Sequence, residues 1–145
     1  MPNPALAAIA DALIAKSVLA GYKSTGLLND VGKDWLQEDN PPAAYLGDAG
    51  ERNEQESTAR ISPKAGFFFL SIVRGDNPTR LFWPLYKALK DAIDVDPTLG
   101  GLATGDNGAR VTGYFSDKTI QAMTARVHRA EIFVEVDYRH DRGNA

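Results

Sequence analysis

The sequence predicts a single α+β domain, in which an antiparallel sheet of about four strands carries two main helices packed on one face. Three observations support this class: two long segments repeat apolar residues at helical spacing, shorter segments are rich in β-branched and aromatic residues, and the order of the elements requires no parallel crossover. With 145 residues, 43% hydrophobic and 24% charged, the chain is long enough to bury one core.

The first helix is expected over residues 3–22. Asn3 can cap its amino terminus, Pro4 suits its first turn, and Gly21 can terminate it. Residues at helical spacing place one apolar stripe along it. The expected members of this stripe are Leu6, Ile9, Leu13, Ile14 and Val18.

Residues 23–42 are predicted to be irregular, because polar residues dominate them and the pair Pro41-Pro42 disfavours helix. A short strand is expected at residues 43–47. Residues 51–64 contain few apolar side chains, which predicts a long solvated connection between two strands. Residues 67–73, Phe-Phe-Phe-Leu-Ser-Ile-Val, predict a central strand that is covered on both faces.

The second helix is expected over residues 78–95, with Pro84 marking either its start or a kink. Its expected buried face consists of Leu81, Leu85, Leu89 and Ile93. Strands at residues 110–115 and 132–138 complete the sheet, and the second alternates apolar and charged side chains. Residues 116–126 fit either a short helix or a strand and turn.

Composition excludes several classes of protein. The net charge of −3 disfavours tight binding of DNA or RNA, because nucleic-acid binders ordinarily carry a basic surplus. The absence of cysteine excludes disulfides and thiolate metal sites. No apolar run is long enough to span a membrane, and the first residues lack the basic region of a signal peptide. We therefore expect synthesis in the cytoplasm and no membrane partner.

No group of residues predicts a catalytic, cofactor-binding or metal site. The loop at residues 98–108 has the glycine spacing of a phosphate-binding loop, but Asp106 stands where that motif requires lysine. Asp137, His140 and Asp141 lie close in sequence, but strand alternation places His140 on the opposite face from the two carboxylates. A three-ligand metal site is therefore not expected.

Protein contacts are expected in two places. Phe82, Trp83 and Tyr86 cannot all face the sheet together with the leucines of the same helix, so at least one is predicted to lie in an interface. The polar segment 51–64 is predicted to be a docking arm that is mobile until a partner orders it. Its predicted contact residues are Glu51, Arg52, Glu54, Glu56 and Arg60.

Three segments carry a family resemblance. Residues 84–102 form a helix and a turn with the sequence Asp-Pro-Thr-Leu-Gly-Gly, residues 130–139 form the closing strand, and residues 42–46 form a strand preceded by proline. Together they resemble the tail terminator (tail completion) proteins of long-tailed bacteriophages and related gene transfer agents. The resemblance extends from about Pro42 to the end and includes a helix at the start of the chain, whereas residues 22–41 match nothing in that family.

The resemblance implies one tail-terminator-like domain over residues 1–145, with a structural role and no enzymatic activity. Tail terminators form a six-membered ring on the last ring of the tail tube, end its polymerisation and join the tail to the head connector. The implied partners are therefore five further copies, the tail tube protein and head–tail connector or neck proteins, with no cofactor. DNA would pass through the lumen without specific binding. The implied location is the head-proximal end of the virion tail, after assembly in the cytoplasm of a host bacterium.

Two other functions stay open at the level of the sequence. A head–tail connector or neck protein would share the ring architecture. A small cytosolic enzyme or ligand-binding α+β domain belongs to another class, and the lack of a coherent acid, base or nucleophile set counts against it. Size-exclusion chromatography with light scattering separates the ring-forming proteins from this last class.

Overall fold

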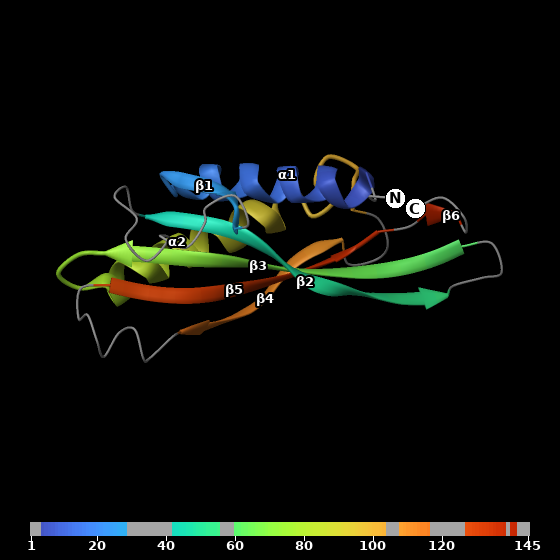
Figure 1. Ribbon diagram of the computed structural model, residues 1–145. Helices are drawn as coiled ribbons and strands as arrows, with labels where there is room; N and C mark the ends of the chain where they lie inside the picture. Colours follow the sequence, from blue (N-terminus) through green and yellow to red (C-terminus); the bar gives the residue numbers. More distant parts are fainter. Residues whose placement is uncertain are drawn as a thin grey trace.

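A mixed β-sheet with two helices on one face makes up the described part of the chain (Figure 1). This computed structural model describes residues 4–28, 42–55, 60–103, 108–116, 127–138 and 140–141. The elements in chain order are α1 (Pro4–Ala20), β1 (Ser24–Leu27), β2 (Ala43–Gln55), β3 (Arg60–Arg74), α2 (Pro78–Asp94), β4 (Ala109–Ser116), β5 (Val127–Asp137) and β6 (His140–Asp141). The predicted α+β class is confirmed, with five main strands in place of about four.

The strand order is β1-β2-β3-β5-β4, and the short β6 pairs with the far end of β3. Every pairing is antiparallel except that of β1 with β2, which is parallel. The prediction of irregular chain over residues 23–42 was therefore wrong for Ser24–Leu27. The amides of Lys23 and Ser24 donate to the carbonyl of Pro42, at 2.8 and 3.3 Å, and so bring β1 alongside the start of β2.

β3 lies at the centre of the sheet, between β2 and β5, as its sequence predicted. Successive side chains of β3 point to opposite faces of the sheet and are buried on both. Phe67 and Phe69 pack toward the helices, whereas Leu70 and Ile72 join a second buried cluster that includes β2 residues. On the helix side, the hydroxyls of Tyr22 and Ser71 share a buried hydrogen bond of 2.8 Å. Burial raises the pKa of the Tyr22 phenol to about 12.

Both helices bury one stripe against the same face of the sheet, as predicted. The fully buried members of this core on the helices are Ile9, Leu13, Phe82, Leu89 and Ile93. α1 ends where predicted, at a positive-φ Gly21 whose amide donates to the carbonyl of Val18. Val18 itself was expected in the stripe but is exposed, because the buried side of α1 passes through the fully buried Ser17 and continues to Ala20.

The buried face of α2 agrees with the predicted one toward its carboxyl-terminal end and differs from it in the first turns of the helix. Leu89 and Ile93 are buried as expected, but Leu81 is 48% exposed and Phe82 occupies its place in the core. The stripe that packs on the sheet therefore follows Phe82, Leu89 and Ile93, at spacings of seven and four residues. The helix starts at Pro78, where the Asn77 side chain caps it, and continues through Pro84.

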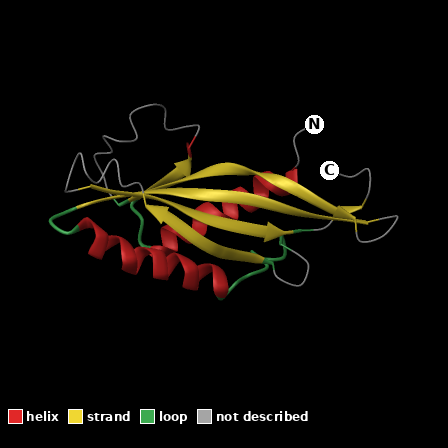
Figure 2. Ribbon diagram, turned by 90° about the horizontal axis from the view of Figure 1, so that it is seen from below, coloured by secondary structure: helices red, strands yellow, loops and turns green. Residues whose placement is uncertain are grey.

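The predicted mobile connection at residues 51–64 is replaced by a paired hairpin. β2 and β3 stay in register from Ala43↔Ile72 to Gln55↔Ile61, with one irregularity between Asp48 and Gly50. In Figure 2, paired strands run on beyond the ends of both helices. The prediction was wrong because backbone pairing extends these strands without needing apolar side chains, and only residues 56–59 lie outside the described part of the hairpin.

Neighbouring side chains of β5 lie on opposite faces of the sheet and differ in burial, so that one can serve as the control for the other. Ile132 is fully buried in the core, whereas Phe133 points to the other face and is 37% exposed. Ile132→Asn should lower the free energy of unfolding by about 3–5 kcal/mol, because it removes buried apolar volume and inserts an unpaired amide. Phe133→Asn should cost far less. Urea unfolding measures both, and equal losses would mean that the register of β5 is wrong.

Candidate interaction surfaces

The predicted contact residues of the hairpin flank its tip. Arg52 and Glu54 lie in β2 and Arg60 lies in β3, whereas Glu56 is outside the described residues. Glu51 is exposed, and its Oε1 accepts a hydrogen bond of 2.5 Å from the hydroxyl of Tyr138. This bond fastens the base of the hairpin to the buried tyrosine that follows β5, so the hairpin starts from an anchored position.

The three aromatic residues predicted at an interface occupy different environments. Phe82 is fully buried, stacks on His128 with ring centroids 4.4 Å apart, and meets Tyr114 edge-on at 5.0 Å. Tyr86 is half-buried and packs against the rings of Phe82 and Tyr114. We therefore place Phe82 in the core, where it has no surface to offer, and only Trp83, at 52% exposed, projects fully from this group.

Trp83 belongs to a small surface patch on the outer side of α2. Together with Arg80, Pro84 and Lys87 it lines a shallow hollow. Lys87 also pairs with Asp91 one turn further on, at 2.6 Å. The patch contains a tryptophan and an arginine, two residue types that are enriched among those that anchor protein contacts.

A second exposed apolar surface lies at the β4 edge of the sheet. Phe115 is 64% exposed, and β4 pairs with β5 alone among the described strands. Phe115 lies opposite Glu131, on the face of the sheet that the helices leave free. An edge strand with an exposed aromatic ring can accept another chain through its backbone and its side chains. This surface was not predicted, because its exposure depends on the strand order.

The Asp-Pro-Thr-Leu-Gly-Gly turn after α2 has a structural role. Asp96 Oδ1 accepts hydrogen bonds from the Gly100 amide and the Thr98 hydroxyl, both at 3.3 Å, while Lys16 Nζ contacts Asp96 Oδ2 at 3.2 Å. The bond from Lys16 holds the pKa of Asp96 below its ordinary value. Leu99 is buried despite a φ of 51°. Lys16 therefore ties the turn at the end of α2 to α1, and the Ala109 amide, which donates to the Pro97 carbonyl at 2.7 Å, ties the same turn to β4. Asp106 lies outside the described residues.

The charged residues near the end of β5 form ion pairs. Arg110 on β4 pairs with Glu135 and, at 3.6 Å, with the buried Asp137. His140 and Asp141 pair their backbones with β3 as β6. Nowhere in the described ranges do three potential metal-ligating side chains come together.

No family model matches the sequence, and no curated protein matches it either. Within the part of the chain that the structure describes, neither helix combines the length and apolar composition needed to cross a lipid bilayer. The surface features described so far are the patch around Trp83, the β4 edge and the hairpin.

The burial of His128 should make the stability of the folded protein depend on pH. It is buried, its Nε2 lies 3.1 Å from Ser116 Oγ, and its Nδ1 finds no hydrogen-bond partner among the described residues. Burial lowers its pKa below the ordinary 6.5, so the unfolded chain binds the proton more readily than the folded one. The stabilisation from the neutral ring is therefore complete above pH 6.5 and is lost as the pH falls through that value toward the folded pKa.

We expect the urea concentration at the unfolding midpoint of the wild-type protein to decrease as the pH is lowered from about 7.5 to 5.5, the range around the histidine pKa. His128→Gln should reduce this fall, because glutamine keeps a partner for Ser116 and does not titrate. His140→Gln, at the other histidine in the sequence, is the matched control and should keep the wild-type fall. An unchanged pH dependence in His128→Gln would contradict the assignment.

Proposed function

We propose that the protein is a structural virion component, a tail terminator that forms a six-membered ring at the head-proximal end of the tail, ends tube polymerisation and joins the tail to the head connector. The assignment to this class rests on the resemblance of residues 84–102 and 130–139. The first range takes in the later part of α2 and the turn that follows it. The second takes in most of β5 and the buried Tyr138.

The observation that carries the assembly part of the proposal is the exposure of large apolar side chains on two separate surfaces. Trp83 projects from the outer side of α2, and Phe115 projects from the free face at the β4 edge. A closed ring needs two different surfaces on each subunit, because its contacts join unlike patches by rotation. Trp83 of one subunit and the β4 edge of the next are suited to such a contact.

The β2–β3 hairpin supplies a third surface, which we assign to the tail tube. It extends beyond the helices as paired backbone and is fastened at its base by the bond from Tyr138 to Glu51. An arm that is already paired loses less conformational freedom on binding than a mobile one. This ordered hairpin replaces the mobile arm expected from the sequence.

The proposed function requires no catalytic chemistry. His128, the histidine whose side chain the structure describes, lies against the Phe82 ring and is buried from any substrate. Glu135 and Asp137, near the end of β5, are engaged in ion pairs with Arg110. We therefore propose a protein that acts through its surfaces.

Particles assembled without the protein test the function as a whole. Electron microscopy of such particles should show tails of uncontrolled length that lack heads, and added wild-type protein should restore a defined length. Tails of normal length in the absence of the protein would contradict the proposal.

The substitution Trp83→Ser tests the ring contact. Its effect can be measured by electron microscopy of the same particles and by native mass spectrometry of the protein mixed with tail tube rings. It should weaken the ring by about tenfold or more in affinity, since exposed tryptophans that anchor interfaces are worth about 2 kcal/mol or more. Val95→Ser, at an 80% exposed apolar residue at the end of the same helix, is the matched control and should leave the ring intact. Equal effects of the two changes would remove Trp83 from the contact.

A further inference from the structure

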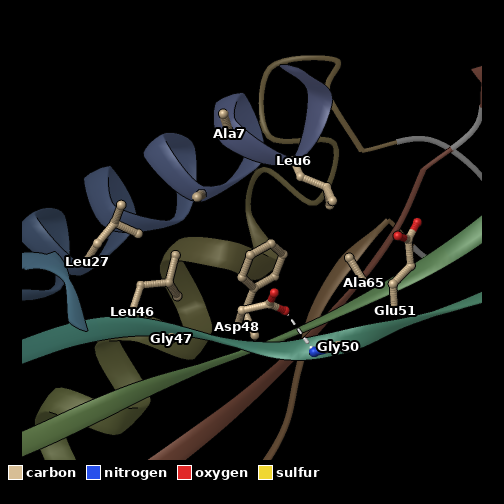
Figure 3. A pocket seen from close by; sticks show the side chains of 11 residues that line it. Leu6, Ala7, Leu27, Leu46, Gly47, Asp48, Gly50, Glu51 and Ala65 are labelled. Atoms are coloured by element: carbon tan, nitrogen blue, oxygen red, sulfur yellow. Dashed lines mark hydrogen bonds between the residues drawn. The ribbon is translucent and has the colours of Figure 1, made fainter. Parts of the chain in front are cut away.

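A pocket of about 290 Å³ opens between α1 and the outer edge of β2 (Figure 3). Leu6 and Ala10 of α1 form one wall, and Leu46 of β2 and Phe67 of β3 form the other. Leu27, the last residue of β1, closes one end. The pocket is therefore apolar on the helix side and the sheet side, and it begins where β1 stops.

The strand edge beside this pocket carries no strand among the described residues. β1 pairs with β2 only from Ser24↔Ala43 to Leu27↔Leu46, whereas β2 continues to Gln55. On its inner side β2 is paired with β3 along this whole length. An open strand edge is a template for an added strand, because its amides and carbonyls point outward in a regular array. A segment added here would continue the line of β1.

Two carboxylates stand at the other end of the pocket, on its helix side. Asp48 pairs with Phe67 and Glu51 pairs with Ala65, and both partners belong to the core beneath the helices. Regular alternation would place residues three apart on opposite faces, but the irregularity between Asp48 and Gly50 brings them to the same one. Gly50 permits this with a φ of 103°, and its amide donates to Asp48 Oδ1 at 2.8 Å.

The charge at this end of the pocket is uncompensated by any lining residue. The lining that the structure describes contains two carboxylates, Asp48 and Glu51, and no lysine, arginine or histidine. Both carboxylates are exposed, and Glu51 has a hydroxyl as its hydrogen-bond partner, so its negative charge is not neutralised by that bond. A cationic group beside them would complement this charge.

We propose that this groove binds an extended segment of a partner polypeptide. The segment pairs its backbone with the outer edge of β2, places an apolar side chain in the pocket under α1, and places a lysine or arginine two residues away beside Asp48 and Glu51. The spacing of two follows from strand alternation, because both side chains must face the helix. The site does not depend on the tail-terminator function, and its partner is defined by this pattern alone.

A displayed library of random nine-residue peptides, selected against the full chain, tests the proposal. Enriched peptides should share an apolar residue and a lysine or arginine at a spacing of two. Ala7→Trp should weaken the binding of a selected peptide by about tenfold or more in a fluorescence anisotropy titration, because Ala7 lines the pocket and is exposed, so that tryptophan can fill it from outside. Ala15→Trp, at another exposed alanine of α1, is the matched control and should bind normally.

Two further changes separate strand pairing from simple apolar binding. N-methylation of the peptide backbone at alternate residues should abolish binding, and Asp48→Asn should weaken it and reduce its dependence on salt. Enrichment of peptides without a basic residue, or binding that Ala7→Trp leaves unchanged, would overturn the proposal. Self-association of the free chain that Ala7→Trp abolishes and Ala15→Trp preserves would also overturn it, since the occupant would then be a second copy.

Discussion

Burial of β3 on both faces is the constraint on which the rest of the structure depends. Phe67 and Phe69 face the helices, and Leu70 and Ile72 face the opposite side, with strands paired along both edges. Each such side chain contributes roughly 1.5–3 kcal/mol when fully buried. The helices α1 and α2 are needed to cover the first face, and the length of β3, from Arg60 to Arg74, carries the hairpin beyond them.

The elements that could be predicted from the sequence are those with a strong apolar signal. Both helices were predicted from apolar residues at helical spacing, β5 from alternation, and the central strand from its continuous apolar run. β1 has no such signal, because Ser24–Leu27 is a strand only through its pairing with β2. The face of α2 was also ambiguous, since Leu81 and Phe82 both continue an apolar stripe; the contacts of Phe82 with His128 and Tyr114 decide it.

The candidate surfaces were less predictable than the fold, because they depend on where strands end and on which strand lies outermost. Trp83 could be singled out as a surplus aromatic residue, whereas the exposure of Phe115 follows from the edge position of β4. The groove beside β2 needs the early end of β1 and the irregularity at Asp48, and neither is visible in composition. The edge, the patch and the groove are the surfaces through which we propose that the protein binds other chains.

Amide hydrogen exchange of the free chain tests most directly the claim that β3 is one continuous strand from the hairpin to the core. The amides that join β2 to β3 at residues 51–55 and 61–65 should exchange at least about 100-fold more slowly than those of an unstructured peptide, as expected of native strand pairs. Exchange at the unstructured rate over both ranges, with residues 67–73 still protected, would contradict it. That result would restore the mobile arm and remove the strand edge on which the groove depends.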